Sequence, residues 1–154
     1  MRAKTKRRCS YDLRRIQETS ARRRAIHAAS CGTADYQVPA WCPFDTENSE
    51  FVIALKEAGH EVVFSHIFMG QDFFEYEPPK WDMIVSNPPF SRKQQVVERC
   101  LALGKPFALL LSNLWLNSSA PCRFFKEREM QILLFDKRIN YSEKNTVNYG
   151  SSYF

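Results

Sequence analysis

The chain has no long apolar segment, and this limits the classes of protein to which it can belong. No stretch of its 154 residues approaches the roughly 18 uncharged apolar residues of a membrane-spanning helix. Its N-terminus also lacks the apolar core of a secretory signal peptide. Hydrophobic residues still make up 44% of the sequence and aromatic residues 14%, which is enough for a buried core. We therefore expect one soluble domain with a cytoplasmic location and no membrane contact.

Cysteine pairs of the C-x-x-C type are also missing. The five cysteines are widely spaced and odd in number, which favours neither a disulfide framework nor a zinc site. The three histidines (His27, His60 and His66) have no partner at ligand or catalytic spacing. We expect reduced thiols that mostly fill the core, and no metal. The cysteines concerned are Cys9, Cys31, Cys42, Cys100 and Cys122.

Charge is unevenly distributed along the chain. Residues 1–36 contain ten basic and three acidic side chains, a net charge of +7, whereas the remaining 118 residues have a net charge of −2. Apolar residues at helical spacing predict a basic, partly helical arm over 1–36, followed by a domain over 37–154. Such an arm is typical of nucleic-acid binding, although a solvated tail or an acidic protein partner fits the same charge. The candidate nucleic-acid-binding residues are Lys6, Arg7, Arg8, Arg14, Arg15, Arg22, Arg23 and Arg24.

After Pro39, apolar runs alternate with amphipathic segments. Two helices are predicted, at 46–58 and 92–103, each followed by a glycine that ends it (Gly59 and Gly104). Alternating strands and helices predict an α/β fold with a doubly wound, mostly parallel sheet. Ligands of such folds bind beyond the carboxyl ends of the central strands. The predicted strands are 38–44, 61–67, 82–86, 107–112, 131–136 and 148–154.

One of these strand ends has an unusual turn, SNPPF at residues 86–90. Asn87 offers a side-chain carbonyl, and Pro88 fixes the direction of its own carbonyl, so the turn presents two acceptors. Two acceptors suit an amino group with two N–H donors, and Phe90 offers a ring on which a planar base can stack. A flipped adenine satisfies both requirements.

The segment DMIVSNPPFS (82–91) resembles motif IV of class I S-adenosylmethionine-dependent amino-methyltransferases, whose signature is Asp/Asn/Ser-Pro-Pro-aromatic. Further segments are similar, in order and spacing, to small phage-type adenine-N6 methyltransferases. The resemblance covers about residues 38–154 and implies a Rossmann-like core, with S-adenosylmethionine as the methyl donor. The further segments are WCPFDTENSEFV (41–52), SHIFMGQDFF (65–74), LGKPFALLL (103–111) and KRINY (137–141).

The resemblance also implies roles for individual residues. Asn87 and the Pro88 carbonyl would hold the target amino group, and Phe90 would stack on the base. The cofactor would contact Phe44 and Asp45 at its methionine part, Ser65 or His66 at its ribose, and Asp72 with Phe73 at its adenine. Asp45 and Asp72 also suit helix caps or turns, and Trp115 suits either the core or a wall of the base pocket.

Three functions follow as hypotheses. The first is methyl transfer to adenine N6 in DNA or RNA, without metal or covalent enzyme intermediate. The second is a degenerate methyltransferase fold that binds nucleic acid or a nucleoprotein, for example a phage inhibitor of a host CRISPR or other defence nuclease. The absence of glycine from CPFDTENS (42–49), where class I enzymes usually have a glycine-rich loop, and the basic arm favour it. The third is a protein glutamine methyltransferase, because a side-chain amide presents the same N–H₂ group.

Overall fold

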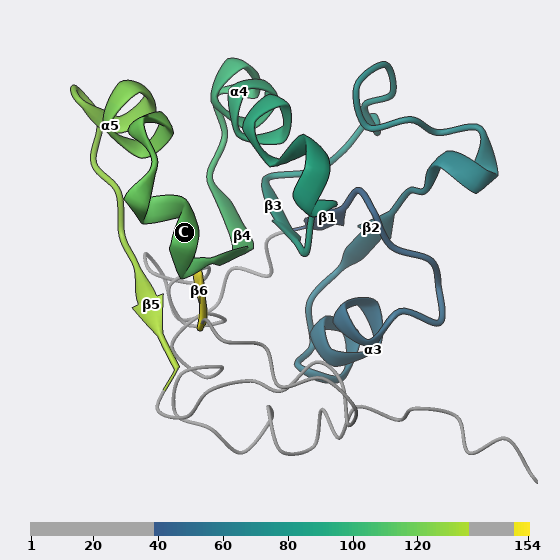
Figure 1. Ribbon diagram of the computed structural model, residues 1–154. Helices are drawn as coiled ribbons and strands as arrows, with labels where there is room; N and C mark the ends of the chain where they lie inside the picture. Colours follow the sequence, from purple (N-terminus) through teal and green to yellow (C-terminus); the bar gives the residue numbers. More distant parts are fainter. Residues whose placement is uncertain (1–38, 136–149) are drawn as a thin grey trace, which may run out of the picture.

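The computed structural model describes residues 39–135 and 150–154 (Figure 1). The predicted arm over 1–36, with all its candidate nucleic-acid-binding residues, lies outside these residues, as do positions 137–149. The described part is a mixed α/β structure whose six-stranded sheet has the order β2-β1-β3-β4-β6-β5. No helix in residues 39–135 or 150–154 is long and apolar enough to cross a membrane.

The sheet is parallel on one side and antiparallel on the other. Strands β1, β2, β3 and β4 pair in parallel, and β6 pairs antiparallel with both β4 and β5. A mostly parallel sheet is therefore confirmed, whereas the antiparallel insertion of β6 was not predicted. The strands are β1 (Ala40–Cys42), β2 (Val62–Phe64), β3 (Met83–Ser86), β4 (Phe107–Ser112), β5 (Leu133–Leu134) and β6 (Ser151–Tyr153).

Strand order reverses at β1. The chain passes from β1 to β2 on one side and then crosses to β3 on the other side of β1. Connections that leave in opposite directions open a crevice at the carboxyl ends of the two central strands, which is where doubly wound folds bind their ligands. The loops after β1 and β3 therefore border the candidate site.

Helices cover both faces of the sheet (Figure 1). On one face, α4 (Lys93–Leu103) and α5 (Ser119–Phe125) pack against Trp41, Ile84 and Leu109. On the other face, α3 (Glu50–Glu57) packs against β1 and β3 through alternate residues of those strands. This alternation follows from the period of two along a strand. Three 3₁₀ turns follow strands β2, β3 and β4: η1 (Ile67–Met69), η2 (Phe90–Arg92) and η3 (Asn113–Asn117).

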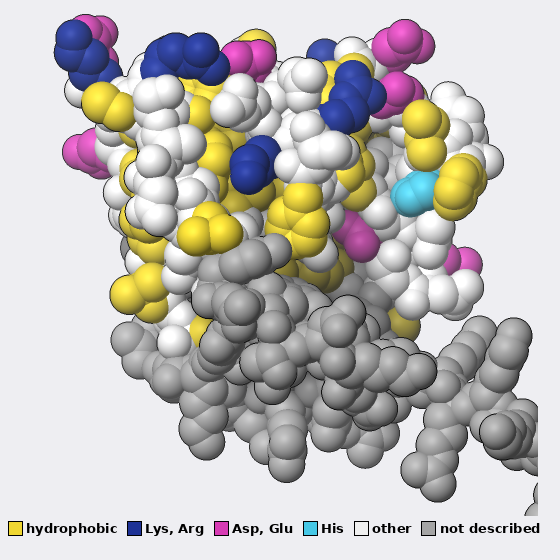
Figure 2. Space-filling model, in the orientation of Figure 1, with side chains coloured by type: hydrophobic (Ala, Val, Ile, Leu, Met, Phe, Trp, Pro, Cys, Tyr) yellow, Lys and Arg dark blue, Asp and Glu magenta, His cyan; other side chains and the backbone are white. Residues whose placement is uncertain are grey.

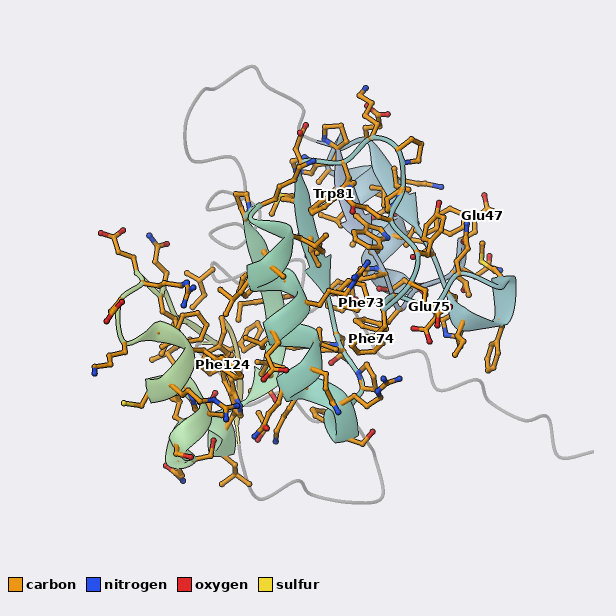
Figure 3. The ribbon with its side chains drawn as sticks, turned by 90° about the horizontal axis from the view of Figure 1, so that it is seen from above. Glu47, Phe73, Phe74, Glu75, Trp81 and Phe124 are labelled. Carbon is orange, nitrogen blue, oxygen red and sulfur yellow. The ribbon has the colours of Figure 1, made fainter. Side chains whose placement is uncertain are left out.

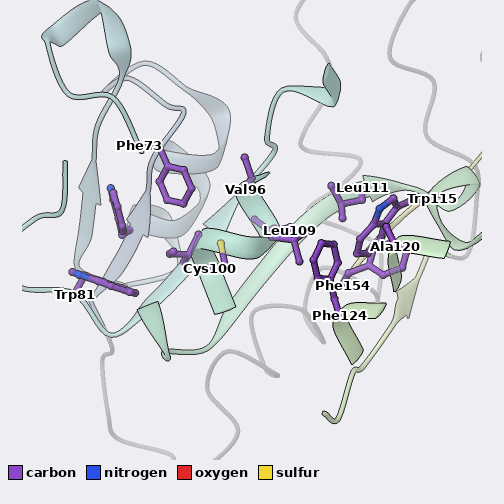
Figure 4. Close-up of a cluster of buried hydrophobic side chains, with 13 residues drawn as sticks. Phe73, Trp81, Val96, Cys100, Leu109, Leu111, Trp115, Ala120, Phe124 and Phe154 are labelled. Carbon is purple, nitrogen blue, oxygen red and sulfur yellow. The ribbon is translucent and has the colours of Figure 1, made fainter. Parts of the chain in front are cut away.

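The larger core is rich in aromatic rings (Figure 4). Trp41 is fully buried, with ring centroids 5.3 Å from Phe73 and 5.2 Å from Trp81. Trp115 packs edge-on against Phe154 at 5.4 Å. Rings in tilted and edge-on contact add about 0.5–1.5 kcal/mol per pair to the burial of their area. The cluster fixes β1, β4 and the segment between β2 and β3 relative to one another.

Several predicted boundaries were wrong. Helix α3 begins at Glu50 rather than 46, because Thr46 and Ser49 close a turn in which the Ser49 hydroxyl accepts the Thr46 amide. Strand β2 ends at Phe64, because His66 caps η1. Helix α5 was not predicted, and it contains Pro121. The proline sits in the first turn, where its missing N–H is harmless.

Candidate functional site

The carboxyl ends of β1, β2 and β3 are joined by polar contacts. Asp45, three residues after β1, accepts a 3.0 Å hydrogen bond at Oδ2 from the hydroxyl of Ser86, the last residue of β3. The Asp45 amide donates to the carbonyl of Ser65, which follows β2, at 3.2 Å. These bonds hold the predicted cofactor loop beside the SNPPF turn.

Asp45 is an uncommonly buried carboxyl, with 9% of its surface exposed. Burial raises the pKa of Asp45 above its usual 3.8, and the hydroxyls of Ser86 and Ser49 and the charge of His66 partly oppose that rise. Asp45 does not cap α3, because the N-cap of that helix is Ser49. The carboxyl instead lies at the switch point, where a raised pKa is typical of a functional position.

The Asn87-Pro88-Pro89-Phe90 turn is anchored in the protein by one buried residue, and its two end residues are exposed. Pro88 is buried, whereas Asn87 is exposed and Phe90 has 55% of its surface exposed. No hydrogen bond to another described residue engages the Asn87 amide. Pro89 is extended, with φ −60° and ψ 127°, and its carbonyl accepts the Arg92 amide at 3.2 Å. At the carboxyl end of β3 the turn thus presents an Asn87 side-chain amide with no hydrogen bond to a described residue, and an exposed Phe90 ring.

Aromatic rings link the loop after β1 to the segment before β3. The half-buried Phe44 ring lies 5.0 Å from Phe73, and Phe73 packs on Trp41 in the core with 2% exposure. Phe74 is half-buried, and the Arg92 guanidinium lies 3.9 Å from its ring centroid. Figure 3 shows Phe73 and Phe74 beside α4. The predicted contact residues Phe44 and Phe73 are therefore together, with Phe73 mainly a core residue.

The two candidates for ribose binding differ in accessibility. Ser65 is fully buried, and its hydroxyl accepts the indole N–H of Trp41 at 2.9 Å. His66 is half-buried, and its Nδ1 accepts the Phe68 amide at 3.1 Å. Of the two, only His66 reaches the surface of the crevice.

Asp72 adopts the turn role that its residue type favours. Its Oδ1 accepts the Phe74 amide at 3.0 Å, and its carbonyl accepts the amides of Glu75 and Tyr76. The preceding Gln71 has a buried Oε1 with no hydrogen-bond partner among the described residues.

Cysteine and metal chemistry find no support in the part of the chain that the structure describes. Burial raises the pKa of Cys100 to about 12 and raises that of Cys42 as well, so both thiols stay protonated. Cys122 is exposed. Residues 39–135 and 150–154 contain no cluster of His, Cys, Asp and Glu that could hold a metal ion. Trp115 belongs to the core, with 1% exposure, and forms no wall of a pocket.

Three contributors to the site were missed in the sequence. Ser86 pairs with Asp45, Trp41 holds Ser65, and Arg92 stacks on Phe74. A serine that ends an otherwise apolar strand was the one available signal, because such a buried hydroxyl needs a partner. The other two contacts join residues more than 15 positions apart, and residue patterns do not reveal them.

A comparison of the chain with protein-family models, curated proteins and solved structures found no match.

Proposed function

We propose that the protein transfers a methyl group from S-adenosylmethionine to the N6 atom of adenine in DNA or RNA. The proposal depends chiefly on one observation. The SNPPF turn follows the central strand β3 at the switch point, with Pro88 buried while Asn87 and Phe90 are exposed. This is the place at which the resemblance to amino-methyltransferases locates the target base, in a Rossmann-like fold.

The chain's own part in the reaction is to orient and polarise the amine. The Asn87 side-chain oxygen and the Pro88 carbonyl accept the two N–H donors of adenine N6, and Phe90 stacks on the base. Hydrogen bonds that strengthen as the amine becomes tetrahedral favour the transition state over the ground state. Bound S-adenosylmethionine would supply the methyl group. The bond from N6 to the methyl carbon would form as the bond from that carbon to the sulfonium sulfur breaks, the surplus amine proton would pass to solvent, and the demethylated thioether would leave.

The residues beside the turn fit the cofactor in part. S-adenosylmethionine supplies an electrophilic methyl group on a sulfonium, and it is rich in N–H and O–H donors. The loop after β1 offers an acceptor in the Asp45 carboxyl and a half-buried ring in Phe44, which packs on Phe73. Of the ribose candidates His66 fits, whereas Ser65 is already bonded to Trp41.

Calorimetry with S-adenosylmethionine and with its demethylated product tests this fit. We expect saturable binding below millimolar concentration, weakened by Asp45→Asn and unchanged by Asn48→Asp, an exposed position in the same loop. Absence of heat at millimolar cofactor, with the chain folded, would refute the catalytic proposal.

A second candidate is a non-catalytic binding module. Ser65, Asp72 and Asp45 each form a hydrogen bond within the chain, and residues 42–49 contain no glycine that lets the backbone approach a cofactor. Deletion of residues 1–30 separates the two. Loss of nucleic-acid binding on deletion, with Asn87→Ala silent, favours the module. Loss of methylation in Asn87→Ala favours the enzyme.

A further inference from the structure

Charge divides the described domain into two unlike halves. Residues 39–85 contain nine acidic and two basic side chains, a net charge of −7. Residues 86–135 contain seven basic and three acidic side chains, a net charge of +4. The division falls at the end of β3, immediately before Asn87.

The division in sequence is only in part a division in space. Residues 70–82 of the acidic half pack against α4 and η2, where Arg99 donates to the Tyr76 carbonyl at 3.3 Å and the Arg92 guanidinium lies over the Phe74 ring. The helices and strands of the sheet do separate by charge. The acidic half forms β1, β2, α3 and η1, whereas the basic half forms α4, β4, η3 and α5. These groups lie on opposite sides of β3 in the sheet order, and the Arg123–Glu98 ion pair at 3.5 Å joins α5 to α4. In Figure 2 the Lys and Arg side chains gather over α4 and α5, with hydrophobic side chains between and below them.

We define the basic edge as Phe90, Arg92 and Lys93, which follow β3, with Leu114 and Leu116, which follow β4. The parallel pairing of these strands brings their carboxyl ends together. Its apolar members are substantially exposed: Phe90 by 55%, Leu114 by 51% and Leu116 by 40%. Its charged members are Arg92, which is exposed, and the half-buried Lys93. Rings and aliphatic groups beside cations are the combination that binds unstacked bases and their phosphates.

The cations of the basic edge differ in their pairing from those of the acidic half. Lys56 and Lys80 of the acidic half form ion pairs, with Glu47 at 4.0 Å and Glu61 at 3.2 Å. No ion pair among the described residues involves Arg92 or Lys93. The Phe74 ring fixes the Arg92 guanidinium in place without using its N–H donors, which leaves the donors for an anion.

We propose that a polynucleotide strand runs along the basic edge. Its phosphates meet Arg92 and Lys93, and the bases on either side of the flipped adenine lie on Leu114 and Leu116. The acidic half repels the strand and faces the methyl donor, whose net charge is positive. This inference rests on the proposed function, and it locates a substrate surface within the domain, apart from the basic arm.

Salt dependence of strand binding tests the proposal with the full chain. Fluorescence anisotropy of labelled 20-residue oligonucleotides gives the slope of log affinity against log salt. We expect Arg92→Gln/Lys93→Gln to reduce that slope by about 1.4 for a single strand and by about 1.8 for a duplex. At about 0.1 M salt these changes correspond to losses in affinity of about 25-fold and about 60-fold. The matched control is Lys56→Gln/Lys80→Gln, which should leave the slope unchanged. The same measurement made with DNA and with RNA oligonucleotides distinguishes the two sources of phosphate.

Two results would overturn the inference. The first is an unchanged slope in the Arg92/Lys93 variant, or an equal loss in the control. The second is displacement of the strand by polyglutamate at equal charge concentration, which would assign the basic edge to an acidic protein. Failure of the proposed function looks different, because S-adenosylmethionine would then not bind while the strand still does. The arm is present in every variant, so its contribution cancels.

Discussion

Replacement of Ser86 by alanine tests whether the bond between the ends of β1 and β3 organises the site. The Ser86 hydroxyl donates to Asp45 Oδ2 at 3.0 Å, and both residues are buried, at 0% and 9% exposure. Water cannot easily replace the lost donor. A hydrogen bond to a charged group contributes about 1.5–3 kcal/mol, so Ser86→Ala should lower the free energy of unfolding by about that amount.

Thermal unfolding provides the assay. For a chain of this length 1 kcal/mol corresponds to about 2–4 °C, which predicts a fall in melting temperature of about 3–12 °C at a pH where Asp45 is ionised. The effect should depend on pH. At a pH where Asp45 is protonated, Ser86 donates to a neutral acceptor, and the cost of the substitution falls to about 0.5–1.5 kcal/mol. The loss therefore grows as pH rises through the pKa of Asp45.

The control is Ser91→Ala, because Ser91 is exposed on η2. That substitution should change the free energy of unfolding by less than about 0.5 kcal/mol. The reasoning is refuted if Ser86→Ala behaves like Ser91→Ala, or if its cost is the same at every pH.

Four further substitutions extend the account. Burial raises the pKa of Asp45, so its ionisation opposes folding; the stability of Asp45→Asn relative to wild type should increase as pH rises above about 3.8, measured by chemical denaturation. Phe90→Ala should leave stability nearly unchanged, because the ring is exposed. It should raise the KM for nucleic acid by about 5- to 150-fold, since stacking contributes about 1–3 kcal/mol per base. Phe73→Ala removes a buried ring and should instead lower the free energy of unfolding by about 3–5 kcal/mol in the same unfolding assay. Gly104→Ala should cost about 1–2 kcal/mol by thermal unfolding, because its φ of +67° disfavours a side chain although nothing crowds it.

The sequence predicted the elements whose local signals agree with their surroundings. Strand β4 matches its prediction at 107–112, because FALLLS is apolar on both faces and follows Pro106. Helix α4 ends where Gly104 adopts the left-handed conformation expected of a C-cap. The exposure of Phe90 also followed from the turn, since two prolines stop the strand and carry the chain out of the sheet.

Features that depend on distant residues could not be predicted. Strand β6 lies antiparallel between β4 and β5, and no property of residues 151–153 specifies that neighbour. Ser65 was a candidate for cofactor binding, yet Trp41, 24 positions away, takes its hydroxyl. The pairing of Asp45 with Ser86 spans 41 positions. Local sequence patterns locate the strand ends, whereas tertiary packing decides which polar groups at those ends are left without a hydrogen bond inside the protein.

The most direct test of the central claim is the amount of N6-methyladenine formed in DNA or RNA incubated with the protein and S-adenosylmethionine, measured by mass spectrometry of the digested nucleosides. The account predicts methylated adenine with the wild-type chain and with Asn48→Ala, an exposed asparagine in the loop after β1, and none with Asn87→Ala. Equal methylation by Asn87→Ala and wild type would contradict the role of the SNPPF turn. Absence of N6-methyladenine from every DNA and RNA tested, with cofactor bound, would contradict the proposed reaction itself.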